Sequence, residues 1–360
     1  MKKRLRLLLP LAAGVLGLAF AAPALAVYQP YLAVQQQNYR VGLATNVGFV
    51  FAADPSNDAT AKMNIFSPAG YTSKATTFSP GTAIGRAYAL VKAGALGGAI
   101  LPLSGPVVVG NPADAKLLAA YAQCKGPTDP ATPQAVWVLN TSLQGQAIQV
   151  PDFVNTSGAY TTQEICLPPP ATAQFQAQVI LANFTINGVF GNAAAAGQYQ
   201  WVGDFTPYTG TVPNAAGTVE FRTFVGLPSS LTFKRVRSKR RFVKFAGKIA
   251  IGGLNIGGIR LRLYYGAKTN PAPNYLNPSL DGLIGRGKNV RAAGAKSSGS
   301  YSITRPRPKK RTYYQMRLDD EYVLTGGCLG PSPSGLPIPC LGEVIAPMTA
   351  NQIKVVPRRR

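Results

Sequence analysis

The sequence contains no histidine and few acidic residues. Of its 360 residues, 13 are aspartate or glutamate, against 37 lysines and arginines. Without histidine, the chain cannot build a Ser-His-Asp or Cys-His catalytic site, most zinc sites, or the usual pH switch near neutrality. We therefore expect a protein that is not an enzyme and that carries no cofactor and no metal ion.

Long apolar runs are also missing after the first 26 residues. The N-terminus has four basic residues among its first six, then an apolar stretch over residues 7–22, then the small-x-small sequence Ala24-Leu25-Ala26. This order is typical of a cleaved signal peptide, so we predict that residues 1–26 are removed and that Val27 begins the mature chain. The lack of a second spanning run predicts a secreted, extracellular protein with no transmembrane segment in its mature part.

Cysteine is scarce, with four residues in the whole chain: Cys124, Cys166, Cys328 and Cys340. An even number in an exported chain predicts two disulfides, and four cysteines allow three pairings. Cys328 and Cys340 flank a stretch of turn-forming glycine, proline and serine, so we expect these two to pair locally. Cys124 would then pair with Cys166.

The charge is distributed unevenly along the chain. Residues 27–226 hold 8 basic and 8 acidic residues, whereas residues 227–360 hold 25 basic and 5 acidic residues. Such a break predicts two domains. We expect a neutral domain of unknown role over residues 27–226, and a strongly basic domain over residues 227–360 that includes a disulfide loop and a basic tail. The sequence GLPSS at residues 226–230 is the predicted linker.

Short apolar runs separated by turn dipeptides fill the neutral half. This pattern favours an antiparallel β-sandwich. One helix interrupts it, over residues 111–124, with Asn111 as the expected cap and Pro112 at the first helical position.

The basic half shows clear alternation of apolar and polar residues. In residues 242–251, 259–265 and 312–318, every second side chain is apolar and those between are often Lys or Arg. Period two predicts half-exposed antiparallel strands whose cations stand in solvent. The predicted fold is therefore all-β, with two antiparallel β-sandwich domains.

Part of the basic half also resembles a known class. The strand-like sequence Gly299–Ile303 followed by Thr312–Tyr314 is similar to a pair of strands in the immunoglobulin-like and transthyretin-like modules of secreted bacterial proteins, including the carboxypeptidase-regulatory-like group. The resemblance covers about residues 228–325. It implies a non-catalytic spacer or binding accessory, although the basicity of this copy departs from the class.

The basic residues are the strongest functional signal. A net charge near +20 on about 134 residues attracts polyanions. Because export disfavours nucleic acid, we expect anionic cell-wall polymers or acidic polysaccharides as partners, and a place at the cell envelope. The alternative is a surface that serves solubility alone. The candidate polyanion-binding residues are Lys234, Arg235, Arg237, Lys239, Arg240, Arg241, Arg305, Arg307, Lys309, Lys310 and Arg311.

Aromatic side chains suggest a second function, the binding of glycans by residues 27–226. Flat rings stack on sugar faces, but the same rings also pack in protein cores, which is the interpretation we favour. The candidates are Trp137, Tyr199, Trp201 and Tyr208.

The acids of the neutral half allow two further hypotheses. Two of the carboxylates could flank a glycosidic bond, although their spacing does not require it. The loops Asp54–Asp58 and Leu318–Glu321 offer oxygen atoms to calcium, but neither matches a calcium-binding loop. We expect these acids to be solvated or to support turns. The four candidate carboxylates are Asp152, Glu164, Asp204 and Glu220.

Overall fold

The computed structural model of the chain describes residues 28–126, 129–143, 145–239, 241–255, 259–267, 286–291, 298–318, 328 and 330–357. The expected signal peptide, Arg240 and the last three arginines lie outside these residues. Within the described part, the chain forms no helix with the length and hydrophobicity that crossing a membrane requires.

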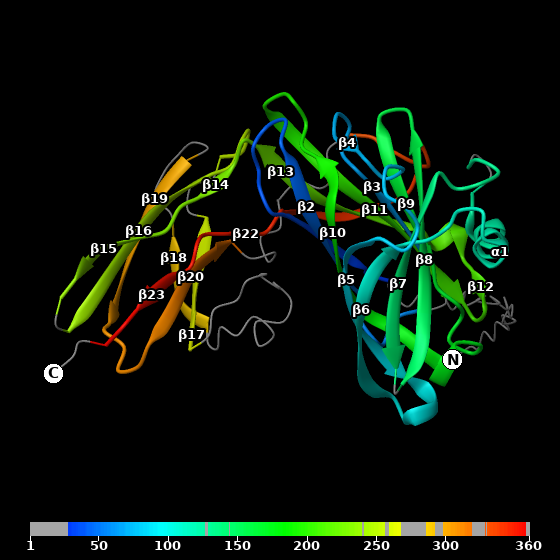
Figure 1. Ribbon diagram of the computed structural model, residues 1–360, viewed down its shortest axis with the longest axis horizontal. Coiled ribbons are helices and arrows are strands. Elements are labelled where there is room, and N and C mark those ends of the chain that lie inside the picture. The colour runs from blue at the N-terminus through cyan, green and yellow to red at the C-terminus, as the bar shows by residue number, and fades with distance from the viewer. Residues whose placement is uncertain are drawn as a thin grey trace, which may run out of the picture.

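A large sheet dominates the described residues (Figure 1). Its hydrogen-bonded neighbours are, in order, β1 (Tyr31–Gln36), β2 (Ala44–Ala52), β10 (Ala177–Gly191), β5 (Ala83–Ala93), β6 (Ala99–Val109), β7 (Ala135–Leu143), β8 (Gln146–Ser157), β9 (Tyr160–Cys166), β3 (Thr60–Phe66), β11 (Gly197–Thr209), β13 (Val219–Leu227) and β21 (Cys340–Ile345). The short strands β4 (Thr72–Ser73) and β12 (Val212–Pro213) pair with β10 and β11.

This sheet is nearly closed into a barrel-like structure, which corrects the predicted N-terminal sandwich. Thr223 of β13 bridges to β1, because its Oγ1 accepts a hydrogen bond from Val34 N at 3.1 Å and donates one to Leu32 O at 3.0 Å. Strands of a sandwich and of a closed sheet alternate in the same way, so the sequence pattern does not distinguish them. The predicted all-β class with one short α-helix is confirmed for the described residues.

The predicted helix is present as α1 (Ala115–Cys124), but its cap differs from the expected one. Asp114 is the N-cap and accepts hydrogen bonds from Lys116 N at 2.9 Å and Leu117 N at 3.2 Å. Asn111 instead accepts from Ala113 N, within the turn that leads into the helix. Short 3-10 helices are η1 (Gly94–Leu96), η2 (Gln174–Gln176) and η3 (Ala215–Gly217).

Two small sheets lie beside the large one (Figure 1). One contains β14 (Ser230–Leu231), β15 (Lys234–Ser238), β16 (Phe242–Ala250) and β19 (Ser298–Pro306), and the other contains β17 (Arg260–Gly266), β18 (Arg286–Arg291), β20 (Thr312–Leu318), β22 (Met348–Thr349) and β23 (Ile353–Val355). The ring centroids of Phe245 and Tyr314 are 4.9 Å apart, so the apolar faces of the two small sheets meet.

The predicted alternation holds in β16 and fails in β20. Val243, Phe245 and Ile249 of β16 are buried as expected. In β20, Arg317 is also fully buried, which corrects the expectation that all cations of this half stand in solvent. Arg317 lies 4.4 Å from the centroid of the Tyr264 ring, and its Nε donates to Gln315 Oε1 at 2.8 Å. Stacking and hydrogen bonding allow a guanidinium to be buried here.

After β20 the chain crosses to the large sheet as β21 and then goes back to the small sheets as β22 and β23. β21 pairs in parallel with β13, with Phe224 opposite Ile345 in the register. One continuous cluster of buried apolar residues extends from the interior of the large sheet into both small sheets. The predicted boundary at residue 226 is therefore crossed by a strand and by the apolar core.

Candidate functional site

The two longest basic runs of the described residues meet at one end of the small sheets. The backbone N–H of Arg307 donates to Arg241 O at 3.0 Å. Its side chain donates to Ser238 Oγ and to Lys239 O, both at 3.1 Å. Arg307 follows β19, whereas Ser238 ends β15 and Lys239 begins the turn to β16. The pairing of β16 with β19 therefore places cations that are almost 70 residues apart side by side.

We call this region the basic end. It lies at the β15 side of the molecule, away from the large sheet (Figure 1). Its described members are Lys234, Arg235, Arg237, Lys239, Arg241, Arg305, Arg307, Lys309, Lys310 and Arg311. Arg240, the remaining predicted member, is outside the described residues.

Most cations of the basic end are exposed, and within the described residues none of them forms an ion pair with an acid. Every residue of β15 is exposed, as are Lys239, Arg241 and residues 309–311. Arg305 and Arg307 are half-buried, and Arg305 lies 5.7 Å from the centroid of the Tyr265 ring. The two ion pairs among the described residues, Lys62–Glu164 and Arg222–Glu220, are both on the large sheet. Such a group of unpaired cations produces a strong positive potential.

The aromatic candidates for glycan stacking are placed differently. Trp137 and Trp201 are 0% exposed, and both make edge-on contacts with Phe190 inside the large sheet. Tyr208 is buried, and its hydroxyl donates to Leu167 O at 2.6 Å. Tyr199 is half-buried against the ring of Tyr71. The rings of Trp137, Trp201 and Tyr208 therefore form core, as the favoured interpretation predicted, and their proposed role as stacking surfaces is corrected.

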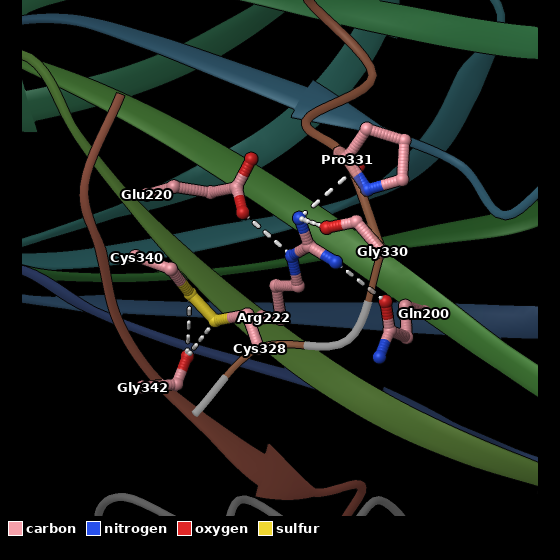
Figure 2. The surroundings of a disulfide bond; sticks show 8 residues. All are labelled: Gln200, Glu220, Arg222, Cys328, Gly330, Pro331, Cys340 and Gly342. Atoms are coloured by element: carbon pink, nitrogen blue, oxygen red, sulfur yellow. Dashed lines mark hydrogen bonds and ion pairs between the residues drawn. A yellow bond between two sulfur atoms is a disulfide. The ribbon is translucent and has the colours of Figure 1, made fainter. Parts of the chain in front are cut away.

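Both predicted disulfides are confirmed. Cys124–Cys166 joins the last residue of α1 to the end of β9, with the Cα atoms 5.8 Å apart. Cys328–Cys340, with Cα atoms 6.0 Å apart, closes the segment that precedes β21. We call residues 328–340 the disulfide loop. Figure 2 shows this bond beside the ion pair of Glu220 and Arg222.

Three of the four candidate carboxylates lie in one row across the outer face of the large sheet. In the register, Glu164 of β9 is opposite Asn64 of β3, Asn64 is opposite Asp204 of β11, and Asp204 is opposite Glu220 of β13. Asp152, the fourth candidate, is opposite Ile165 and belongs to the interior face. The row consists of residues that are far apart in sequence, so spacing could not have revealed it.

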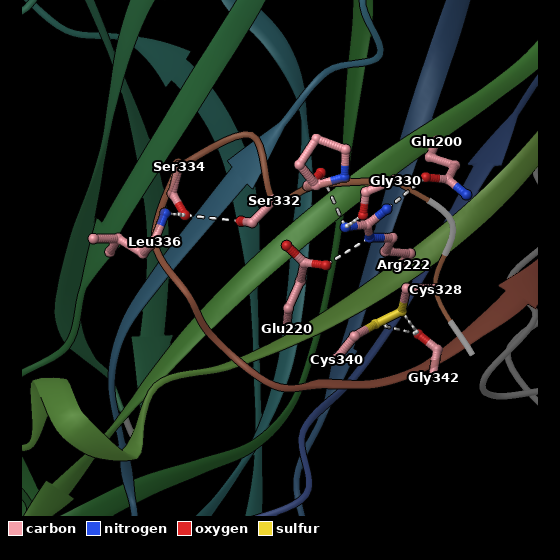
Figure 3. Close-up of polar contacts among 11 residues, drawn as sticks. Gln200, Glu220, Arg222, Cys328, Gly330, Ser332, Ser334, Leu336, Cys340 and Gly342 are labelled. Carbon is pink, nitrogen blue, oxygen red and sulfur yellow. Dashed lines mark hydrogen bonds and ion pairs between the residues drawn. A yellow bond between two sulfur atoms is a disulfide. The ribbon is translucent and has the colours of Figure 1, made fainter.

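Arg222 holds the disulfide loop over this row. Its guanidinium forms a buried ion pair with Glu220 and donates to Gln200 Oε1 at 2.9 Å. It also donates to the backbone oxygens of Gly330 at 3.0 Å and Pro331 at 3.2 Å (Figure 3). No motif in the sequence marks Arg222, which is the only basic residue between residues 126 and 233. A single basic residue within a long stretch that has no other can indicate a cation with a structural role.

Burial changes the protonation of these acids. Burial raises the pKa of Asp204 to about 7. The nearby charge of Glu220 also raises this pKa, whereas a hydrogen bond from Ser334 lowers it. Burial also raises the pKa of Glu164 to about 7, although the charge of Lys62 lowers it. Carboxyl groups that titrate near neutrality can serve as general acids or bases. Asp204 and Glu220 are 3% and 1% exposed under the disulfide loop, however, so a substrate could reach them only if that loop moved.

The positions of the described acids and cysteines give little support to the hypothesis of a metal site. Among the residues that the structure describes, one group of three potential ligands lies within 4.8 Å: Glu220, Cys328 and Cys340. Both sulfurs are in the disulfide, so they are not available as thiolates. Asp54 accepts hydrogen bonds from the backbone and hydroxyl of Ser56, as expected of a turn. The second acidic loop, beginning at Asp319, lies outside the described residues.

Comparison with known proteins adds no relative. No protein-family model matches the sequence, and no curated protein matches it. The resemblance to immunoglobulin-like and transthyretin-like modules therefore stays a prediction, and the function has to be argued from the site itself.

Proposed function

We propose that this is a secreted, non-catalytic protein that binds anionic polymers of the cell envelope through its basic end. The observation that carries the proposal is the meeting of two basic runs on one exposed surface, joined by the hydrogen bonds of Arg307 to Ser238 and Lys239. A polymer bears charge at regular intervals, so it can contact many of these cations at once. The large sheet would then present a second surface to other molecules.

The disulfides and the composition are consistent with this location. Structural disulfides persist in oxidising compartments outside the cytoplasm. All four cysteines of the chain are paired in two disulfides. Together with the predicted signal peptide, this supports an exported protein. The anionic polymers that such a protein meets include phosphate-bearing wall polymers and acidic polysaccharides.

A salt series with matched charge variants tests the proposal. We expect the protein to be retained on purified wall polymer at low salt and released steeply between about 50 and 200 mM salt, because several fixed charges act together. The triple variant Lys239→Gln, Lys309→Gln, Lys310→Gln should be released at much lower salt than the wild type. Retention that is independent of salt, or absent at every salt concentration, would exclude this function.

The chain offers a matched control for charge removal. Lys74, Lys116 and Lys125 are exposed and belong to the half that contains the large sheet. Lys116 and Lys125 lie in or next to α1, at the opposite side of the molecule from β15 (Figure 1). Changing these three lysines to glutamine removes the same charge, and we expect wild-type retention. Equal weakening by both triple variants would show that net charge alone drives binding and would contradict a role for the basic end.

A further inference from the structure

A groove of about 850 Å³ lies where the large sheet meets the small sheets. One wall is formed by β1, β2, β5 and β10, and the other by residues 229–231 and 348–349. The groove uses the outer face of the large sheet, because in β2 its residues Asn46 and Gly48 alternate with the buried core residues Val47 and Phe49. None of the predicted site residues lines it.

The groove is distinct from the basic end. It reaches β14, where Ser230 is opposite Ala250, the last residue of β16. Most of the basic end lies around the other end of the same strand, next to Phe242. Its member nearest to the groove, Lys234, is opposite Ala246, four residues or about 13 Å along the strand from Ala250. Ser238, which precedes Lys239, is opposite Val243, about 23 Å along the strand from Ala250, so a small ligand in the groove does not reach the turn that carries Lys239.

Strand register arranges the polar side chains of the groove in two neighbouring rows. In one row, Gln35 of β1 is opposite Gly48, Gly48 is opposite Thr185, and Thr185 is opposite Arg86 of β5. In the next row, Asn183 of β10 is opposite Tyr88 of β5, and Tyr88 is opposite Ser104 of β6. Amide, hydroxyl, guanidinium and phenol groups thus share one face. Gly48 leaves the floor of the first row without a side chain.

Several of these groups are available to a ligand. Within the described residues, the side chains of Gln35, Arg86, Tyr88 and Ser104 make no hydrogen bond and no ion pair with the protein. Arg86 is exposed, and Tyr88 is half-buried, so that part of its ring can be contacted. Thr185 is already bonded, because its Oγ1 accepts from Arg86 N at 3.3 Å, and this bond positions the strand that carries Arg86.

The charge of the groove favours one class of ligand. Its lining includes Arg40 and Arg86 but no aspartate or glutamate. Amides and hydroxyls can both donate to and accept from sugar hydroxyls, and an aromatic face packs against a sugar ring. A guanidinium binds a carboxylate through two parallel hydrogen bonds. We propose that this groove binds a short acidic oligosaccharide, with Arg86 on a uronate carboxylate and Tyr88 against a sugar ring.

This site goes beyond the proposed function, because it recognises individual sugars instead of the charge of a polymer. Titration calorimetry of the full mature chain with a trimer of a hexuronic acid, at about 150 mM salt, tests it. We expect saturable one-to-one binding of the trimer, and at least tenfold weaker binding of the neutral trimer of the same hexose. Absence of binding to the uronate trimer at millimolar concentration, or equal binding of the two trimers, would overturn the proposal.

Variants then locate the binding. Arg86→Gln and Tyr88→Ala should each weaken binding of the uronate trimer about tenfold or more. Arg86→Lys should weaken this binding less than Arg86→Gln does, because the positive charge is kept. Lys116→Gln, on α1, should bind as the wild type. Because these side chains are at the surface, thermal melting should show that all four variants fold. Wild-type affinity in both Arg86→Gln and Tyr88→Ala would overturn the assignment to this groove.

The two proposals fail separately. The triple lysine variant of the basic end should lose polymer retention but should bind the uronate trimer with wild-type affinity. Loss of trimer binding in that variant would show that the sugar binds at the basic end and would overturn the proposal that it binds in the groove. Unchanged polymer retention in that variant would instead contradict the proposed function and leave the groove intact.

Discussion

Arg222 is held between Glu220, two residues earlier on the same strand, and the disulfide loop. One side of its guanidinium pairs with Glu220, and the other donates to the backbone of Gly330 and Pro331. Glu343 of β21 is also fully buried, and the nearby charge of Arg222 opposes the rise that burial causes in its pKa. One cation therefore fastens the disulfide loop, which leads into β21, to the large sheet.

We expect Arg222→Met to destabilise the protein by about 3–5 kcal/mol, because it leaves buried acids without their counter-charge. Urea unfolding would measure this loss. Limited proteolysis should also cut the disulfide loop faster, since Gly330 and Pro331 lose their donor. The exposed Arg86→Met variant is the control and should unfold as the wild type does. A loss in Arg222→Met no larger than in Arg86→Met would contradict the fastening role.

Stability should fall as the pH rises from about 4 to about 7. Burial raises the pKa of Asp152 strongly and those of Glu164 and Asp204 to about 7. In this window the folded state holds protons that the unfolded chain has already released, so the free energy of unfolding decreases by up to about 1.4 kcal/mol per pH unit for each acid.

Urea unfolding at a series of pH values would check this slope. Asp152→Asn keeps the shape of the side chain without its charge, so we expect a flatter profile and a gain in stability at pH 8. The exposed variant Asp58→Asn should leave the profile unchanged. A profile that rises between pH 4 and pH 7 would show that these acids are ionised and stabilised in the folded state.

Removing the second disulfide should weaken the fold moderately. Cys328 and Cys340 are 12 residues apart, and a loop of this size predicts a loss of about 3 kcal/mol in the double variant Cys328→Ser, Cys340→Ser. Thermal melting under oxidising conditions would measure it. Under reducing conditions that cleave both disulfides, this variant and the wild type should melt at similar temperatures. A double variant as stable as the oxidised wild type would indicate that Arg222 alone holds the loop.

The cap of α1 gives a local test of the structure. Asp114→Ala removes the acceptor for Lys116 N and Leu117 N, so we expect a loss of about 1 kcal/mol. Asn111→Ala, at the cap that the sequence pattern favoured, should have a smaller effect because Asn111 bonds only within the preceding turn. Urea unfolding of the two variants distinguishes the alternatives. A larger loss in Asn111→Ala would place the cap where the sequence pattern put it.

Much of the local structure was predictable. The alternation of Val243, Phe245 and Ile249 with polar residues predicted β16, because side chains of a strand point to opposite faces in turn. The turn-rich segment between Cys328 and Cys340 predicted their pairing. The burial of Arg317 was not predictable in this way, because its place in the alternation is the one that cations usually take at a solvated surface.

By itself, the sequence determined the all-β class, the helix near residue 115, both disulfides and the concentration of positive charge after residue 226. Each of these follows from composition or from neighbours within a few residues. Only the tertiary structure decided that the large sheet is nearly closed, that Glu164, Asp204 and Glu220 share one row, and that the polar groove lies between the sheets. Those features depend on which strands pair and in what register, and such long-range pairing leaves no periodic trace in a single sequence.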